Sequence, residues 1–277
     1  AAGEYVLLRE PATGFELQSR MEPVGDDVSA NVAAAMRAGD GTAVMIDSAD
    51  ANPLWIGGVN TELADGDSVA VGSDRVFRDG DTYTVVFAGA DGLVGDGDDR
   101  VGVAVFDNRV DIGVTVDNPG FARSFEGLLG DGDGNPDNDV FLADGTVLPR
   151  PLTFDDLYGP LRDAWRIEAG ESLFTYDAGE TTDGFYLPNF PTGMASIGDF
   201  DAADVEAARQ AARDGGLTEG TANFENAVLD FLLTGDTGFI ESAASVPGVS
   251  APEVSAAASV EIDTSGGLTG LSTLTVQ

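Results

Sequence analysis

The sequence predicts a mainly β protein: an antiparallel β-sandwich followed by a small α-helical hairpin and an extended C-terminal tail.

 Three observations support this prediction. Short segments of alternating apolar and polar residues, separated by Gly and Asp turns, recur from residue 1 to about residue 118. Helical periodicity replaces this pattern between residues 199 and 245, and after Pro247 the composition shifts to Ser, Ala, Val and Gly.

The strand signals are strongest in the second half of the β region. Residues 82–87 are rich in β-branched and aromatic side chains, which suit a pleated sheet surface. Residues 101–106 and 110–114 alternate on either side of an Asp-Asn pair that tolerates the backbone of a tight turn, so they predict a hairpin. Residues 28–38 are rich in Ala and fit either a helix or a strand, and the sequence does not decide between the two.

Residues 199–245 predict two helices. Asp201 can cap the first helix, and Gly215-Gly216 ends it. The second helix ends at Gly235 and has an apolar stripe with the i, i+4, i+7, i+8 spacing of a buried helix face. The stripe consists of Phe224, Val228, Phe231 and Leu232. In the tail that follows, residues 258–262 and 272–276 alternate as strands do.

The charge balance narrows the range of partners. Thirteen basic residues, all of them Arg, stand against 49 acidic residues, which gives a formal net charge of -36. Nucleic acids and anionic membrane surfaces require cationic side chains, so we expect neither as a partner. Most of the acidic residues are expected to form a solvated coat suited to salty surroundings, halophilic or marine, and a minority to bind divalent cations.

Residue types that are missing from the chain exclude several kinds of chemistry. The sequence contains no Cys and no His, which excludes disulfides, thiolate catalysis, Cys/His zinc sites and His-based triads. Carboxylate pairs for glycoside hydrolysis remain conceivable, but no pair has a distinguishing context, so we expect no enzymatic activity. No apolar run approaches the roughly 18–20 residues of a membrane span. The chain opens directly on strand-like residues 5–8, and we expect a secreted protein whose leader, if it had one, has been removed.

Residues 127–139 are the most informative segment for chemistry. Acidic or amide side chains occupy every second position from 131 to 139, and Gly132 and Gly134 permit tight turning. Calcium takes six to eight oxygen ligands from flexible loops of this kind. The loop lacks the Glu that closes an EF-hand at its twelfth position, and by itself it fits either a calcium site or a solvated acidic turn.

Two further acidic segments have more than one interpretation. Residues 96–99 fit a second cation loop, although the tip of a hairpin is favoured. Asp199, Asp201 and Asp204 fit a calcium-binding helix start, but helix capping accounts for them. Both Trp residues are interpreted as core anchors.

The order of the motifs resembles that of von Willebrand factor type D domains. Residues 125–130, the Asp loop and residues 139–142 are similar to the family's G-x-x-G-N-x-D-G turn and N-D pair. Residues 144–146 and 163–167 are similar to its x-D-G-T hairpin and S-W strand. Upstream, two segments resemble its G-E-F-x-L and F-x-V-Q-x-R strands, and downstream three resemble a helical extension found in microbial secreted proteins. The upstream segments are residues 1–9 and 15–20, and the downstream segments are residues 171–176, 190–191 and 230–236.

The resemblance implies a β-sandwich with calcium held near the turn. By position, the ligands it implies are Asp131, Asp133, Asn135, Asn138 and Asp139, with Asn135 acting through its carbonyl. Asp131 stands where the family has Asn. The family's opening G-D-P-H segment, which contributes a calcium-site Asp, is absent, and so are its cysteines, so disulfide-linked multimers are not expected.

We therefore expect four parts: a sandwich over residues 1–168, a connecting segment over 169–195, a helical extension over 196–245, and a linker with a β-prone tail over 246–277. The expected function is a secreted, calcium-stabilised structural or adhesive module whose partners are copies of itself or other surface proteins. Because the first strand of the family is missing, the tail of one copy can fill a neighbour's open sheet edge and build a filament. A cleaved first strand that stays bound is the other possibility, and a monomeric carbohydrate- or surface-binding module is the alternative function.

Overall fold

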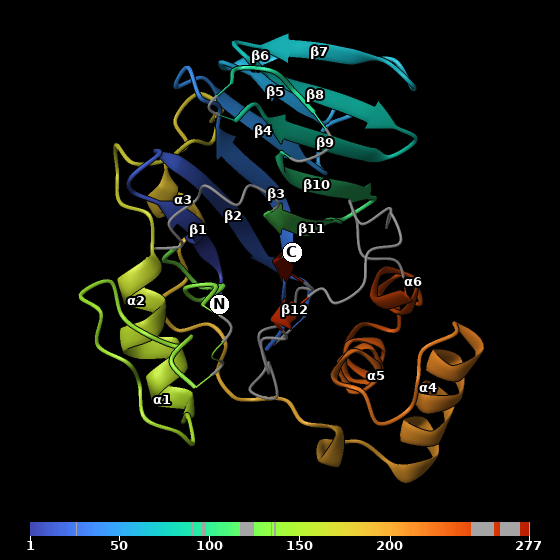
Figure 1. Ribbon diagram of the computed structural model, residues 1–277. Helices are drawn as coiled ribbons and strands as arrows, with labels where there is room; N and C mark the ends of the chain where they lie inside the picture. The colour runs from blue at the N-terminus through green and yellow to red at the C-terminus, as the bar shows by residue number, and fades with distance from the viewer. Residues whose placement is uncertain are drawn as a thin grey trace.

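The computed structural model describes residues 1–25, 27–89, 91–95, 98–116, 125–133, 135 and 137–244, and the backbone of two tail strands at 258–260 and 272–276. Two β-sheets pack face to face, and the longer helices gather at one end of the molecule (Figure 1). The predicted fold class, a mainly β protein with an antiparallel sandwich followed by a helical hairpin, is confirmed. No helix in the described part of the chain is long and apolar enough to cross a membrane.

The first sheet contains six antiparallel strands in sequence order. They are β1 (Gly3–Glu10), β2 (Phe15–Pro23), β3 (Ser29–Arg37), β4 (Ala43–Asp47), β5 (Leu54–Ile56) and β6 (Val59–Asn60). The Ala-rich stretch that the sequence left undecided forms β3. Ala34 and Met36 face the second sheet, whereas Ala33 and Ala35 face a second apolar cluster on the opposite side. A strand that is buried on both faces has no polar alternation, which explains why its pattern was ambiguous.

The second sheet contains five antiparallel strands that follow one another in the chain. They are β7 (Ser68–Val71), β8 (Asp74–Asp79), β9 (Thr82–Phe87), β10 (Asp99–Phe106) and β11 (Arg109–Val116). The predicted hairpin is confirmed, because Phe106 pairs with Arg109 across the Asp-Asn turn. Beyond β11, the backbone of β13 (Ser272–Val276) pairs with it in parallel, and β12 (Ala258–Val260) pairs antiparallel with β13. Ile262, expected to continue the first tail strand, lies outside the described residues.

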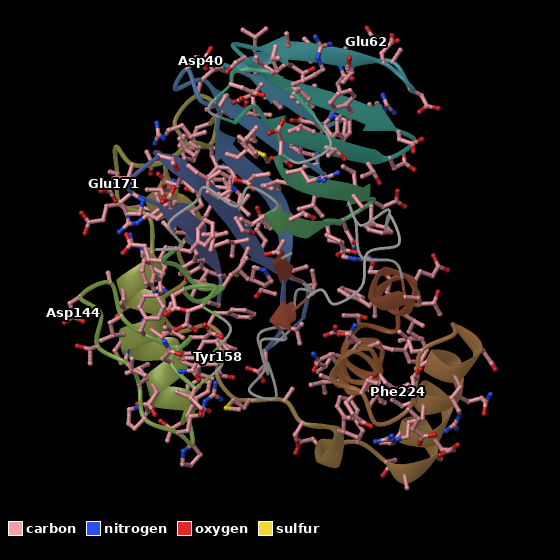
Figure 2. The ribbon with its side chains drawn as sticks, viewed as in Figure 1. Asp40, Glu62, Asp144, Tyr158, Glu171 and Phe224 are labelled. Carbon is pink, nitrogen blue, oxygen red and sulfur yellow. The ribbon has the colours of Figure 1, made fainter. Side chains whose placement is uncertain are left out.

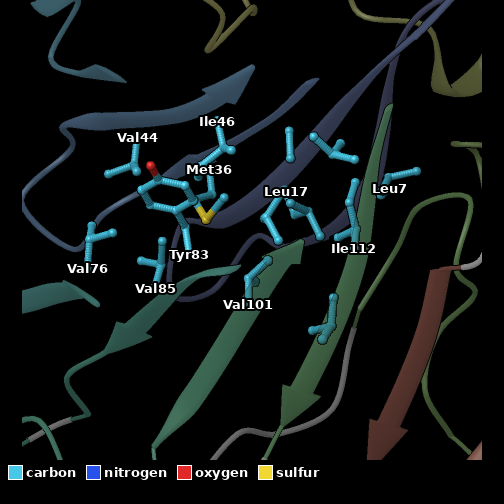
Figure 3. Packing of buried hydrophobic residues seen from close by; sticks show 14 of the residues in the cluster. Leu7, Leu17, Met36, Val44, Ile46, Val76, Tyr83, Val85, Val101 and Ile112 are labelled. Carbon is cyan, nitrogen blue, oxygen red and sulfur yellow. The ribbon is translucent and has the colours of Figure 1, made fainter. Parts of the chain in front are cut away.

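The main core lies between the two sheets (Figure 3). Alternate residues of each strand point into it, so that the first sheet contributes five of the labelled side chains and the second sheet the other five. They are Leu7, Leu17, Met36, Val44 and Ile46, facing Val76, Tyr83, Val85, Val101 and Ile112. Removing these side chains from water is the main favourable term in forming the sandwich.

A second apolar cluster covers the outer face of the first sheet, where residues 141–174 pack against Val6, Ala33, Ala35 and Met45. Short helical turns supply much of this cover: α1 (Phe154–Asp156), a π-helical turn (Leu157–Leu161) and α2 (Arg162–Trp165). The expectation that Trp165 belongs to a strand is wrong, since it is the last residue of α2. Strand-like pairing starts one residue later, where Arg166 bridges to Tyr5.

Trp165 is nevertheless the core anchor that the sequence indicated. Its side chain is 1% exposed, and its ring meets that of Phe141 edge to face, with the centroids 5.6 Å apart. The indole N–H donates a 2.8 Å hydrogen bond to the Phe141 carbonyl, so the buried polar atom is satisfied.

The helical extension contains the two predicted helices and a third one. The short helix α3 (Thr182–Phe185) and a 3₁₀ turn (Ile197–Asp199) lead to α4 (Ala202–Asp214), α5 (Ala222–Thr234) and α6 (Gly238–Ala244). Asp201 occupies the N-cap of α4 without a side-chain hydrogen bond, and Gly235 ends α5 with a left-handed backbone. The predicted stripe is buried at Phe224 and Val228. The sequence did not predict α6, which is only seven residues long.

Arg109 joins the helical extension to the second sheet. Its side chain is buried, and its guanidinium lies 4.1 Å from the ring centroids of both Phe106 and Phe239. Its Nη1 donates a 2.9 Å hydrogen bond to Asp236, which precedes α6. Three acidic groups, Asp111, Asp230 and Asp236, therefore surround a single buried cation. Burial and, to a smaller extent, the charge of Asp111 raise the pKa of Asp230, Arg109 opposes both, and the resulting pKa is about 7.

The folded pKa of Asp230 lies above that of an unfolded chain, so its contribution to stability is complete below about pH 4 and is lost as the pH rises through 7. We expect Asp230→Asn to raise the free energy of unfolding at pH 8 by roughly 1–3 kcal/mol relative to the parent, and to change it little at pH 4. Chemical unfolding at the two pH values measures this difference. The exposed Asp79→Asn is the control. A loss of stability at pH 8 would show instead that the protein uses the Asp230 carboxylate in its charged form.

Candidate metal centre

The Asp loop begins at a segment that is fastened to β1. The backbone N–H groups of Leu128 and Leu129 donate to the carbonyls of Val6 and Leu7 at 3.2 and 2.9 Å. Gly127, with φ of 143°, lies so close to this strand that a Cβ atom would collide with the Leu7 carbonyl. The start of the loop is therefore set by the sheet, and a glycine is required there.

Within the loop, each polar side chain holds the backbone two residues further on. Asp131 Oδ1 accepts from the Asp133 N–H at 3.0 Å, and Asp133 Oδ1 accepts from the Asn135 N–H at 2.6 Å. Asn135 Oδ1 accepts from the Asp137 N–H at 3.3 Å. This repeated turn explains the spacing of two in the sequence, since an Asx side chain caps its own turn in this way.

The turns bring three carboxylates together. Asp131, Asp133 and Asp139 each offer an oxygen, and these oxygens lie within 4.8 Å of one another. Among the residues that the structure describes, no other group of three acidic side chains converges in this way. Asn138 joins the cluster, because its Nδ2 donates to Asp131 Oδ2 at 3.0 Å and to Asp133 Oδ2 at 3.1 Å. Four of the five expected ligands therefore lie side by side.

The fifth expected ligand, Asn135, contacts the cluster through its backbone N–H, which donates to Asp133 Oδ1 at 2.6 Å. It is exposed, its side-chain oxygen accepts from Asp137, and its carbonyl accepts from the Asn138 N–H at 3.3 Å. Both of its oxygens are therefore used within the turn. Gly134 and Pro136, on either side of it, lie outside the described residues.

Asp139 is the member of the cluster with the greatest need for a cation. Its residue is 5% exposed, and its Oδ2 has no hydrogen-bond partner. Burial raises the pKa of this carboxyl, and the charges of Asp131 and Asp133 add to the shift. Gly130, with φ of 86°, makes the close approach possible, because a Cβ atom there would collide with the Asp139 carboxylate. A buried carboxylate oxygen without a donor is costly unless a cation neutralises it.

Asn138 supplies a second unused oxygen. Its Oδ1 is buried without a partner while its amide group donates to two carboxylates. The side chain thus places the positive end of its dipole where negative charge accumulates. Amide O and N positions are assigned from hydrogen bonding, and half a turn of the amide presents Oδ1 to the cluster instead. The residues present therefore fit a hard cation that binds oxygen.

Within the described residues, the other acidic segments do not form comparable groups. Asp199 accepts from the N–H and hydroxyl of Ser196, so it closes a capping box, as helix capping predicts. Of residues 96–99, Asp96 and Gly97 lie outside the described residues. Asp98 accepts from the Gly95 N–H at 2.6 Å, which is typical of a turn. Elsewhere, acidic side chains such as Asp40, Glu62, Asp144 and Glu171 lie at the rim of the molecule (Figure 2).

Comparison with known proteins adds no relative. No protein-family model matches the chain, and a search of curated proteins finds no match either. The resemblance to type D domains therefore rests on the order of the motifs in the sequence.

Sequence reasoning did not separate the members of the loop by burial. Five alternating polar residues look alike in the sequence, yet Asp139 is buried while Asp133 and Asp137 are exposed. One signal was present: Asp139 directly precedes the apolar run Val140-Phe141-Leu142, which packs against the outer cluster. A polar residue next to such a run is drawn into the interior together with it.

We expect calcium to raise the thermal midpoint of the protein in high NaCl, since a ligand that binds only the folded state stabilises it by about 2.7 kcal/mol at one hundred times its dissociation constant. Melts with EDTA, magnesium or calcium measure the effect. Asp139→Ala and Asp133→Ala should abolish the rise, whereas Asp137→Ala, an exposed acidic residue of the same loop, should keep it. If calcium and magnesium shift the thermal midpoint equally, and the variants respond as the parent does, the calcium site is rejected and the loop is a solvated acidic turn.

Proposed function

We propose that the protein is a calcium-stabilised structural or adhesive module that acts outside the cell. The observation that supports this most directly is the buried, unpaired oxygen of Asp139 beside two further carboxylates, in a loop fastened to β1. The motif order of type D domains points in the same direction. The role assigned to the loop is structural, and no catalytic step is assigned to any residue.

Calcium suits these ligands better than the other common metals. All the candidate ligands are oxygens, and the chain contains no Cys or His, the side chains that usually bind zinc. They come from one short irregular loop, and calcium accepts irregular coordination, whereas magnesium requires a near-ideal octahedron. The ion would be held by the carboxylates of Asp131, Asp133 and Asp139 and by the side-chain Oδ1 of Asn138. Water or backbone carbonyls would occupy its remaining coordination positions. Bound calcium would neutralise the cluster and hold the loop against β1.

An extracellular setting agrees with the surface chemistry. A net charge of -36 keeps the chain soluble in concentrated salt, where screening weakens repulsion between neighbouring carboxylates. Millimolar calcium, which weak loop sites need, is typical of extracellular modules. Without disulfides, a bound ion is one of the few remaining ways to strengthen a loop-rich edge of the sandwich.

The tail offers a route to self-assembly. The backbone of β13 pairs with β11 over five residues, from Ile112↔Ser272 to Val116↔Val276. A strand that adds to a sheet edge through main-chain hydrogen bonds makes the same bonds whether it comes from the same chain or from a second copy. Exchange of this strand between copies would link them into a filament.

We expect the full chain to associate as its concentration rises, and a chain that lacks residues 248–277 to remain monomeric. Light scattering over a concentration series, in high NaCl with calcium, compares the two. If both chains stay monomeric, the filament hypothesis is rejected and the module acts as a single copy. A far-UV spectrum and a melt of the shortened chain establish whether its sandwich is still folded.

A further inference from the structure

A cavity of about 370 Å³ opens at the margin of the first sheet's outer face. Its volume falls in the range of small-ligand sites, and it is separate from the Asp loop. Residues of β2, β4 and β5 line one side, and the segment that runs from Thr175 to Phe185 lines the other. Asn108, in the turn between β10 and β11, also lines it.

Arg20 is the buried cation of this cavity. It is 5% exposed, its Nε donates to Glu4 at 2.9 Å, and its guanidinium lies 3.9 Å from the ring centroid of Phe185. Its Nη1 donates to Asp47 at 3.4 Å, while its Nη2 has no hydrogen-bond partner. The guanidinium is therefore held in place with one donor group unused.

Carboxylates are the most frequent polar groups in the lining of the cavity. The carboxylates of Glu22, Asp47, Asp177 and Glu180 all line the cavity. They are spread around it, and no three of its carboxylates converge as those of the Asp loop do within the described chain. The arrangement therefore does not fit a metal ion. It fits a larger ligand that presents several hydrogen-bond donors in different directions.

Aromatic side chains supply flat apolar surface next to these polar groups. The indole of Trp55 lines the cavity, and its Nε1 donates to Asp50 at 2.7 Å, which fixes the ring. Tyr176 and Phe185 also line the cavity, with their ring centroids 6.1 Å apart, and both rings pack against the Arg20 guanidinium. A pyranose ring combines an apolar C–H face with hydroxyl groups that both donate and accept, so it matches both kinds of wall.

The geometry points to this cavity as a binding site for one unit of an uncharged or amino-bearing sugar. Uronic and sulfated sugars are excluded, because the surplus of carboxylates repels an anion. The inference rests on the adhesive role proposed above, and it identifies a sugar as the ligand to which the protein would adhere. It does not require the calcium site, so the two can fail separately.

Titration of the full chain by calorimetry and ligand-detected NMR, with calcium present, tests the inference. The probes are methyl glycosides of glucose, galactose and mannose, then glucosamine, with glucuronate as the acidic control. At least one uncharged or amino sugar should bind saturably, and glucuronate at least tenfold more weakly. For an uncharged sugar, affinity should change less than twofold between 0.5 and 2 M NaCl, since no net charge is paired. Absence of saturable binding by every sugar overturns the inference.

The rival explanation is that the cavity binds organic cations. Agmatine, an organic cation without sugar hydroxyls, tests it. If agmatine binds instead of the sugars, and its affinity falls steeply with salt, the cavity is a cation site and the inference is rejected. A normal calcium melt of the same sample shows that the calcium proposal survives such a result. An absent calcium response with intact sugar binding would reject only the calcium proposal.

Two pairs of variants locate the binding. Trp55→Leu should weaken sugar binding at least tenfold, whereas Phe77→Leu, an exposed aromatic residue of the second sheet, should not. Trp55 also packs against the outer cluster, so its replacement can disturb the fold as well as the cavity. Glu180→Arg is therefore a second test, because Glu180 is exposed and the longer arginine side chain fills the cavity. Glu171→Arg, at an exposed position that does not line the cavity, is its control. Equal binding by Glu180→Arg and Glu171→Arg places the sugar elsewhere and overturns the assignment.

Discussion

Burial of the first sheet on both faces is the constraint on which the rest of the structure depends. One face packs on the second sheet, and residues 141–174 cover the other. In the chain, the Asp loop lies between the second sheet and that cover, and the segment at its start is fastened to β1 by backbone hydrogen bonds. The cavity opens at the margin of the same face, where the residues that follow Phe174 in the chain line it. The loop and the cavity are thus both consequences of how this sheet is covered.

Two buried arginines connect parts of the protein that are distant in the chain. Arg20 lies among Glu4, Asp47 and the rings of Phe174 and Phe185, whereas Arg109 ties the helical extension to β11. In both places a planar guanidinium stacks on aromatic rings and hydrogen-bonds to carboxylates at its edge. An ammonium group is a compact point charge and cannot do both, which gives a physical reason why arginine occupies these sites in a chain that contains no Lys.

The acidic residues serve different ends according to their burial. At the rim, carboxylates stay hydrated and repel one another weakly in salt. In the Asp loop, the carboxylate of Asp139 is buried, and its unpaired oxygen is costly unless a cation binds there. Around Arg109, three carboxylates share one cation, and the pKa of Asp230 rises to about 7 as a result of its burial. Formal charge alone does not distinguish these cases.

The sequence by itself determined the fold class, the hairpin of β10 and β11, the helices α4 and α5, and the Asp loop, because each depends on local periodicity or turn chemistry. It did not decide whether the Ala-rich stretch is a strand, where Trp165 lies, or that Asp139 is buried while Asp137 is exposed. Those outcomes depend on contacts between residues far apart in the chain, which local patterns do not encode. The Arg20 cavity likewise exists only where β2, β4, β5 and residues 175–185 meet, so tertiary packing alone determines it.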